Sequence, residues 1–138
     1  MSYGSFSSSA ARYREVEVNS ATPGQLVVIL YDHLLTHLAR ARHAMGPDQI
    51  EARSDALSVC RTVVTELLVT LDRERGADLA VHLGAIYSFV LGELTTLGLR
   101  PEMKRLDRVT RIMQELRDAF AQAAQTAPVP AAAARSVA

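Results

Sequence analysis

Hydrophobic residues recur at intervals of three and four positions along most of the chain, and this spacing predicts amphipathic helices. The first predicted helix covers residues 23–45. Thr22 is a favourable N-cap, Pro23 suits the first helical position and Gln25 completes a capping box. Gly46 and Pro47 then end this helix and open the next one.

Three further stretches keep the same spacing. They predict a second helix that ends near residues 73–76, a third from about Ala77 to a C-cap at Gly98, and a fourth opened by Pro101. The residues expected to face the core are Leu57, Cys60, Val64, Leu67 and Leu71, then Leu79, Leu83, Ile86, Val90, Leu94 and Leu97, then Leu106, Val109, Met113, Leu116 and Phe120. Short connections favour antiparallel packing of neighbouring helices.

We therefore predict an all-α protein with a mobile N-terminal arm at residues 1–22, an antiparallel up-down four-helix bundle at 23–125 and a disordered Pro/Ala tail at 126–138. One segment points elsewhere, because residues 26–31 form an unbroken apolar run rich in β-branched residues, as in a buried strand. The capping box and the continuation of the helical pattern to Leu38 favour a helix there.

Several predicted helices carry more apolar residues than one inward stripe requires. The first is apolar all round at residues 26–31, and the second and third add residues outside their stripes. These additional residues are Val59, Val63, Val69, Val81, Tyr87, Phe89 and Leu91. Part of this surplus belongs in a wide core, and the rest predicts an exposed patch where a peptide, a partner helix or a second copy docks.

Composition narrows the function classes. The chain of 138 residues has 15 basic and 15 acidic residues, so no overall field attracts nucleic acid. Cys60 is the lone cysteine, which suits a reducing compartment, and no secretory signal precedes the bundle, so we expect a cytoplasmic location. Residues 79–99 are apolar enough to suggest a membrane span, but His82, Ser88, Thr95, Thr96 and several glycines argue against insertion.

The candidate chemistry is sparse, and we expect neither an enzyme nor a cofactor. His33 and His37 stand four apart and could share a metal, but a zinc site needs three or four ligands and no zinc motif surrounds them. A histidine phosphotransfer domain is also a four-helix bundle, yet no histidine is followed by its characteristic lysine and glycine. The pattern therefore favours a bundle that binds a partner protein, with no metal.

The segment Tyr-Arg-Glu-Val-Glu-Val-Asn-Ser-Ala-Thr-Pro-Gly-Gln-Leu at residues 13–26, followed by Leu30-Tyr31-Asp32, closely resembles the opening of the flagellin-specific export chaperones, the FliS family. The likeness continues at residues 66–72, 83–87 and 116–120. The motif residues that carry it are Thr22, Pro23, Gly24, Leu26, Tyr31 and Asp32.

This resemblance implies a cytoplasmic four-helix bundle that holds the disordered C-terminal segment of flagellin. Covering that segment prevents premature polymerisation until the flagellar export gate receives the subunit. The matching N-terminal arm is residues 13–18, from Tyr13 to Val18, with Tyr13 at the aromatic position that the family uses for client handling and contact with the export gate protein.

The chain departs from the family on the third helix, where Tyr87-Ser-Phe-Val-Leu-Gly-Glu93 lacks the usual arginines. We therefore expect an apolar client groove between the second and third helices, lined by Val59, Val63, Tyr87 and Leu91. The alternative is a regulatory or adaptor bundle that self-associates, for instance as a homodimer, or binds another helical client.

Overall fold

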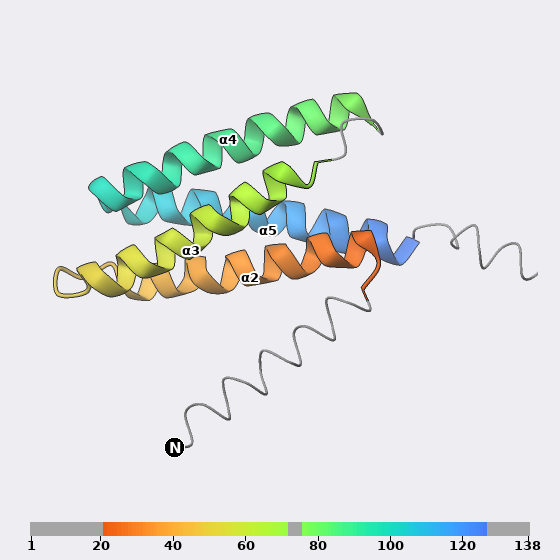
Figure 1. Cartoon of the computed structure of the whole chain (residues 1–138). Coiled ribbons are helices and arrows are strands. Elements are labelled where there is room, and N and C mark those ends of the chain that lie inside the picture. Colours follow the sequence, from red (N-terminus) through yellow and green to blue (C-terminus); the bar gives the residue numbers. More distant parts are fainter. Residues whose placement is uncertain (1–20, 72–75, 127–138) are drawn as a thin grey trace, which may run out of the picture.

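The computed structural model describes residues 21–71 and 76–126, which form four long α-helices and no strand. The helices are α2 (Pro23–His43), α3 (Ile50–Val69), α4 (Ala77–Leu99) and α5 (Met103–Thr126). Each helix runs antiparallel to the one before it (Figure 1). The predicted all-α up-down bundle is confirmed, and the run at residues 26–31 is helical. The predicted arm and tail lie outside the described residues except at residues 21, 22 and 126.

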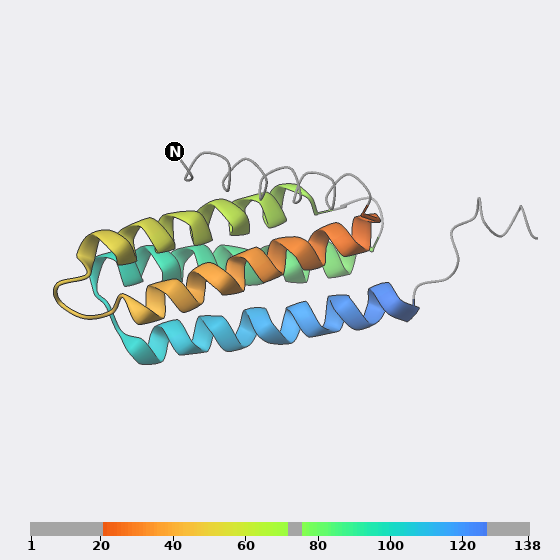
Figure 2. The ribbon, with the colours of Figure 1, turned by 90° about the horizontal axis from the view of Figure 1, so that it is seen from below.

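The helices are unequally packed. α2 lies between α3 and α5 and contacts both extensively, whereas α4 packs mainly on α3 and has a thinner contact with α5. Figure 2 shows α2 and α5 side by side along their lengths. The seam between α4 and α5 is therefore the least closely packed of the four neighbouring pairs.

The predicted inward stripes form the core except at Leu79, which was expected to face inward but is 59% exposed in the first turn of α4. Among the largest side chains that are fully buried are Tyr31, Leu34, Leu57, Leu67, Tyr87, Leu94, Leu106 and Met113. Cys60 is also fully buried, and its thiol faces the carbonyl oxygen of Leu34 across the α2–α3 contact. Burial raises the pKa of the Cys60 thiol to about 12, because the thiolate would lose its hydration.

Two tyrosines meet inside this core. Tyr31 on α2 and Tyr87 on α4 belong to diagonally placed helices, and their hydroxyl oxygens are 2.5 Å apart. The Tyr31 ring also stacks on Phe120 of α5, with a centroid distance of 5.6 Å. Burial raises the pKa of both tyrosines, so their hydroxyls stay protonated and satisfy each other.

The start of α2 follows the sequence prediction. The Thr22 hydroxyl accepts from the backbone N–H of Gln25 at 3.2 Å, and the Gln25 side chain accepts from the backbone N–H of Thr22 at 3.0 Å. This reciprocal capping box satisfies two N–H groups that a helix start leaves without partners.

The predicted ends of the other helices need correction. α3 ends at Val69, before residues 73–76, and α4 continues through Gly98 to Leu99. Arg100 is the C-cap of α4 and is extended, with φ −135° and ψ 93°. Pro101 follows it, and a residue before proline is pushed out of the helical region, so the proline sets this boundary.

A buried arginine fastens the α2–α3 turn. Arg53 is 8% exposed, and its Nη1 donates to the carbonyl oxygens of Ala44 at 3.1 Å and Gly46 at 3.2 Å. These carbonyls follow the last turn of α2, where backbone acceptors lack helical partners and the helix dipole is negative. The periodicity of the sequence gave no sign of this contact.

Candidate partner-binding site

Three surface depressions follow pairs of neighbouring helices in the described part of the chain. The first, between α2 and α3, has a volume of about 450 Å³. The second, between α2 and α5, has about 550 Å³. The third, between α3 and α4, has about 430 Å³ and is called here the α3–α4 groove.

The α3–α4 groove is lined by small and apolar residues. Its lining consists of Leu68, Leu71, Ala77, Ala80, Val81, Gly84 and Ser88. Ser88 is the one polar side chain among them, and none carries a charge. Val81 is 70% exposed, so part of this apolar lining faces solvent. The groove therefore offers an apolar channel suited to the apolar face of a peptide helix.

Small residues shape this groove. The α4 residues Ala77, Ala80, Gly84 and Ser88 follow each other at intervals of three and four and form one edge of the helix. A Cβ added at Gly84 would lie 3.7 Å from Cδ1 of Leu71, an ordinary contact, so the backbone of α4 forms part of the wall. Farther along the same helix pair, a Cβ added at Gly98 would lie 3.8 Å from Nη1 of Arg61.

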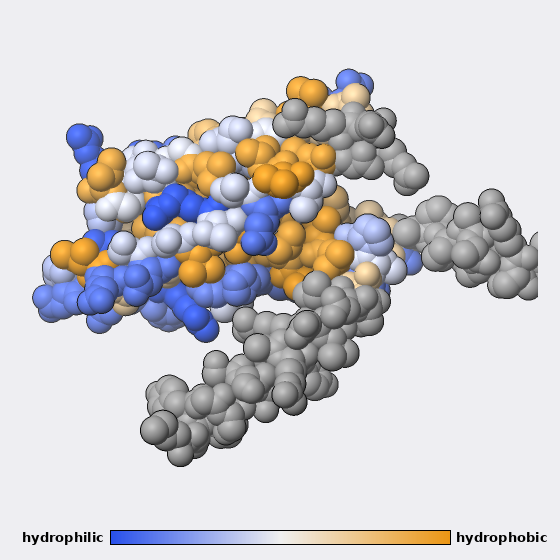
Figure 3. All heavy atoms as spheres, viewed as in Figure 1, coloured by the Kyte–Doolittle hydropathy of each residue, from blue (hydrophilic) through white to orange (hydrophobic). Residues whose placement is uncertain are grey.

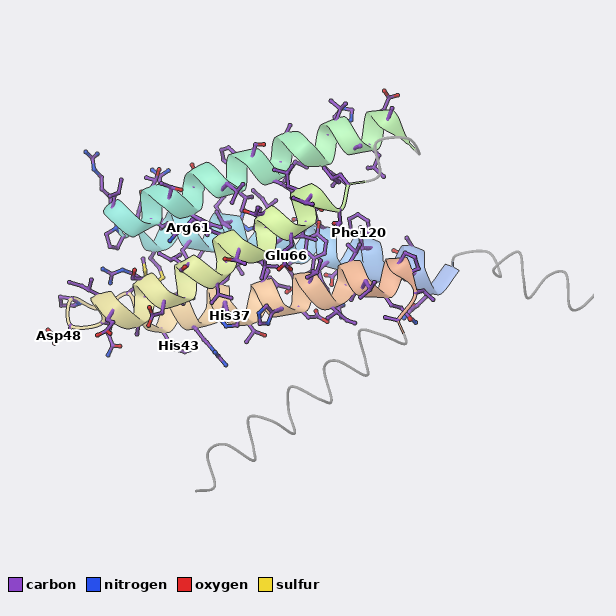
Figure 4. All side chains as sticks on the ribbon, viewed as in Figure 1. His37, His43, Asp48, Arg61, Glu66 and Phe120 are labelled. Carbon is purple, nitrogen blue, oxygen red and sulfur yellow. The ribbon has the colours of Figure 1, made fainter. Side chains whose placement is uncertain are left out.

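Apolar surface gathers toward the end of the bundle where α3 ends and α2 begins (Figure 3). Phe120, which projects from α5, lies at this same end (Figure 4). Val69, at the last position of α3, is 78% exposed, and Leu79 in the first turn of α4 is 59% exposed. The α3–α4 groove thus opens into the more apolar end of the molecule.

The structure places the predicted groove residues differently from the sequence prediction. Val63 and Tyr87 are core residues, with exposures of 3% and 1%, and cannot touch a partner in this conformation. Val59 and Leu91 are partly buried against the core, and Val59 lines the α2–α3 depression instead. The predicted helix pair does carry a groove, but different residues line it. Tyr13 and Val18 lie outside the described residues.

The correction has a physical cause. α3 packs against both α2 and α4, so a wider sector of its surface is buried than a single stripe would cover. Val63 and Val64 are therefore buried together. Tyr87 is directed inward by its hydrogen bond to Tyr31, which a hydrophobicity pattern alone does not reveal. The small-residue spacing at residues 77–88 was the signal for the groove that sequence reasoning missed.

The motif residues at the start of α2 contribute to the core and to the contact between α2 and α5. Tyr31 is in the core, and Leu26 is partly buried. A Cβ at Gly24 would lie 3.5 Å from Cβ of Ala124, which shows how closely α2 approaches α5 there. The Asp32 carboxylate accepts from Nε of Arg117 at 2.8 Å, an ion pair that joins the same two helices.

The α2–α5 depression is more polar than the α3–α4 groove. Val28 and Ile29 face Ala121 and Ala124, but Gln25, Gln125 and the Asp32–Arg117 ion pair share the lining. A bound segment would have to offer polar partners for these groups as well as apolar side chains.

Two histidines, His37 and His43, line the α2–α3 depression. His37, Arg40 and His43 line one side and Asp55 lies among the remaining lining residues. His37 and His43 both project from α2 (Figure 4). Nδ1 of His37 lies 3.0 Å from the carbonyl oxygen of His33, and the two imidazole rings are 4.5 Å apart. Among the described residues, no three His, Cys, Asp or Glu side chains gather as a metal site requires.

α4 is also unusually long and apolar. By length and composition alone, it is the one helix in the described residues that could cross a membrane. Helices that contribute to the core of a bundle can meet the same two criteria, and α4 supplies the core residues Leu83, Val90, Leu94 and Leu97.

Comparison with known families gives a consistent result. The sequence model of the family described as flagellar protein FliS matches residues 6–127. The flagellar secretion chaperone FliS of Bacillus subtilis (strain 168) is 30% identical over 114 residues, which cover 83% of this chain and 84% of the relative. The flagellar secretion chaperone FliS of Escherichia coli (strain K12) is 31% identical over 107 residues, which cover 77% and 79%.

A solved structure shares the fold. The crystal structure of a flagellar chaperone from bacteria superimposes with a TM-score of 0.71, covering 86% of this chain and 96% of that chain. The two sequences are 17% identical, so this likeness bears on the arrangement of helices.

Proposed function

The chain belongs to the family of flagellar protein FliS, and from this premise we propose that it is a cytoplasmic export chaperone for flagellin. In this proposal it binds the disordered C-terminal segment of flagellin, prevents premature polymerisation and delivers the subunit to the flagellar export gate. Family relatives are named flagellar secretion chaperones, which are not enzymes.

The observation that carries the proposal is the uncharged lining of the α3–α4 groove. A disordered client gains little from scattered polar contacts, because fixing each backbone residue costs about 1–2 kcal/mol. Each large apolar side chain that becomes fully buried contributes about 1.5–3 kcal/mol. A client helix that places apolar side chains along Leu68, Leu71 and Val81 can therefore offset its ordering cost over several turns.

The decisive variant is Gly84→Leu. The new side chain would occupy the groove, while replacing glycine in a helix favours folding by roughly 0.5–1 kcal/mol. We expect the affinity for a peptide with the flagellin C-terminal sequence to fall at least about tenfold, which corresponds to 1.4 kcal/mol. Isothermal titration calorimetry measures the affinity, and circular dichroism checks that the melting temperature has not fallen.

A matched control is Ala52→Leu, which adds a leucine at an exposed helical position in the α2–α3 depression. Its affinity should equal that of the wild type. If Gly84→Leu binds the peptide as tightly as the wild type does, the α3–α4 groove is not the client site.

The arm that carries Tyr13 and Val18 is proposed to act on the same client. If residues 13–18 compete for the empty groove, deleting residues 1–17 raises the affinity for the flagellin peptide. If they hold the client, the same deletion lowers it, so one titration separates the two roles.

A further inference from the structure

Charges are segregated between the two ends of the bundle. The α2–α3 turn and the α4–α5 turn lie at the same end, called here the turn end, which comprises residues 38–61 and 89–111 (Figure 1, Figure 2). Basic residues outnumber acidic ones there, and within the described residues Arg117 is the one arginine or lysine outside it. The opposite half carries the acidic residues Asp32, Glu66, Asp78, Glu115 and Asp118. A chain with no net charge thus has a basic end that attracts anions.

A row of basic residues runs from the α4–α5 turn along the outer face of α5. Lys104, Arg108 and Arg111 share one helical face over about 10 Å, and Arg100 precedes them in the turn. All four residues are exposed, and none forms an ion pair with a carboxylate of the described residues. These four residues are called here the α5 basic row.

The carboxylates near this row are already occupied. Glu93 and Glu102 pair with Arg105 at 3.0 and 3.5 Å, and Asp107 pairs with Arg42 at 2.9 Å. The charge of the α5 basic row is therefore open to a partner from outside the described structure.

The row is unfavourable for the helix that carries it. Lys104 and Arg105 lie in the first turn of α5 and Arg108 in the next, where the helix dipole is positive. No acidic residue lies in that first turn, whereas Glu51 and Asp78 occupy the first turns of α3 and α4. An anionic partner would turn this unfavourable arrangement of charges into a favourable one.

Exposed apolar side chains stand beside the row in the α4–α5 turn. Leu99 is 80% exposed and immediately precedes Arg100. Met103 is 38% exposed and immediately precedes Lys104. The turn therefore combines cationic and apolar groups, as the membrane-facing sides of peripheral proteins do.

Phe89 extends this apolar surface along α4. It is 49% exposed and precedes Glu93 by one helical turn, so it lies on the side of α4 that pairs with Arg105 of α5. Arg108 follows Arg105 by three residues and therefore borders the same seam. An exposed aromatic ring and an unpaired guanidinium thus lie along the thinly packed α4–α5 seam.

We propose that the α4–α5 corner of the turn end binds the surface of an anionic lipid bilayer. The α5 basic row lies among the headgroups, while Leu99 and Met103 enter the boundary between headgroups and acyl chains. The contact is peripheral, so α4 keeps its core residues packed in the bundle. Each Lys or Arg beside anionic lipid strengthens binding about fivefold, and half of the protein should be bound at on the order of 1 mM accessible lipid.

A bilayer suits this surface better than a peptide or a nucleic acid does. None of the three depressions described above includes a residue of the α5 basic row, and a peptide helix needs a groove. Nucleic acid would satisfy the cations but offers its phosphates to the exposed Leu99 and Met103. The combination of charge and aliphatic side chains therefore points to lipid.

The client groove remains accessible in this arrangement. The lining of the α3–α4 groove, from Leu68 to Ser88, lies in the opposite half of the bundle. Lipid binding at the turn end thus goes beyond the proposed client binding, and it is measured without flagellin.

Flotation of the full chain with vesicles tests the proposal. We expect binding to equal amounts of phosphatidylcholine and phosphatidylglycerol in about 0.1 M NaCl, where the Debye length is about 10 Å. Binding should be lost in about 1 M NaCl and absent with phosphatidylcholine alone, because the attraction is electrostatic. A wild type that floats equally with both kinds of vesicle, or with neither, overturns the proposal.

Lys104→Glu separates lipid binding from stability. It reverses one charge of the row, so binding to the anionic vesicles should fall at least about tenfold. It also places an acid in the first turn of α5, so the melting temperature should not fall. Binding equal to that of the wild type would contradict the role of the row.

The matched control is Arg40→Glu. It makes the same change of net charge at the turn end, but Arg40 lines the α2–α3 depression, and α5 packs on the other side of α2. Its binding should stay within about twofold of the wild type, because the substitution lies away from the lipid contact. An equal loss in both variants would show that net charge alone decides binding, and the proposed corner would be wrong.

A tryptophan probe reports whether apolar side chains enter the bilayer. The chain has no tryptophan, so Leu99→Trp introduces a single fluorophore at the corner. Its emission should move to shorter wavelength with the anionic vesicles, and brominated lipid should quench it. Val69→Trp, at an exposed position in the opposite half, should show neither effect. Unchanged emission from vesicle-bound Leu99→Trp would overturn the proposed apolar contact.

An electrophoretic mobility shift with duplex DNA identifies the alternative partner. No complex is expected from the wild type. If DNA binds more tightly than the vesicles and Lys104→Glu abolishes that binding, the row is a nucleic-acid surface and the bilayer proposal is wrong. Lys104 and Leu99 do not line the α3–α4 groove, so a negative result here leaves the effect of Gly84→Leu on client binding untouched.

Discussion

The hydroxyl oxygens of Tyr31 and Tyr87 are 2.5 Å apart in the core, where they join the diagonal helices α2 and α4. Each is the polar partner of the other, because both side chains are almost completely buried. This hydrogen bond fixes the relative position of two helices that otherwise touch little.

Replacing one of these tyrosines by phenylalanine should be costly. Tyr31→Phe leaves the Tyr87 hydroxyl buried without its partner, and we expect the free energy of unfolding to fall by about 1–3 kcal/mol. Urea denaturation monitored by circular dichroism measures the change.

The double variant Tyr31→Phe/Tyr87→Phe provides the control, because it leaves neither hydroxyl behind. Its loss should be smaller than the sum of the two single losses, as expected for residues that interact directly. Strictly additive losses would show that the two hydroxyls contribute independently.

Stability should fall at alkaline pH. Burial raises the pKa of the Cys60 thiol from 9.0 to about 12, so above pH 9 the unfolded chain releases a proton that the folded chain retains. The free energy of unfolding then decreases by up to about 1.4 kcal/mol per pH unit for each such group. Tyr31 and Tyr87 add to this decrease above their ordinary pKa of 10.0.

The Cys60→Ala variant isolates the contribution of the thiol. Between pH 9 and 10, its free energy of unfolding should decrease by about 1 kcal/mol less than that of the wild type. Lys104 is the sole lysine of the chain, so few other side chains titrate in this window. Equal decreases in both proteins would contradict the burial of the thiol.

The buried Arg53 should be a strong determinant of stability. Arg53→Met keeps much of the apolar stem but removes the donor that serves the carbonyl oxygens of Ala44 and Gly46. Hydrogen bonds to charged groups contribute about 1.5–3 kcal/mol, and a loss of that size is expected in urea denaturation. Arg111→Met, at an exposed position on α5, should change stability by less than about 0.5 kcal/mol. A similar effect of both substitutions would argue against the role of Arg53 at the turn.

The ion pair between Glu93 and Arg105 should matter more than exposed pairs do. Nη1 of Arg105 lies 3.0 Å from each carboxylate oxygen of Glu93, and the side chains are 29% and 14% exposed. Arg105 also lies 3.5 Å from Glu102 on its other side. Glu93→Ala leaves a half-buried guanidinium with that weaker partner, and we expect a loss of about 1–3 kcal/mol.

Asp107→Ala is the comparison for that ion pair. Asp107 pairs with Arg42 at 2.9 Å, but these side chains are 40% and 53% exposed, so water screens the interaction. Its removal should therefore lower the melting temperature less than Glu93→Ala does. Thermal denaturation of the two variants ranks the ion pairs, and an equal loss in both would show that burial does not decide their strength.

Helical periodicity in the sequence predicted most of the fold. Leu57, Cys60, Val64 and Leu67 were expected in the core from their spacing alone, and all are buried. Periodicity gives the direction of a buried face but not its width, which depends on how many neighbours a helix has. Val63 was therefore misplaced, since α3 is covered on two sides.

The hydrophobic pattern could not predict contacts between individual side chains. The inward position of Tyr87 depends on Tyr31, which is 56 residues away in sequence. The end of α4 depends on Pro101 more than on Gly98, because the proline restricts the residue before it. A client groove was predicted between α3 and α4, and a groove lies there, yet its lining follows from small residues that a search for large apolar ones overlooks.

The uneven grip on α4 has a dynamic consequence. α4 packs mainly on α3, the Tyr31–Tyr87 hydrogen bond joins its middle to α2, and the Glu93–Arg105 ion pair joins its C-terminal half to α5. The N-terminal turns of α4 should therefore separate from the bundle before the rest of the helix does. Amide protons around Leu79 and Val81 should then exchange with deuterated water sooner than those around Leu94. The bundle can thus open locally at the N-terminal end of α4 while the rest of the core stays packed.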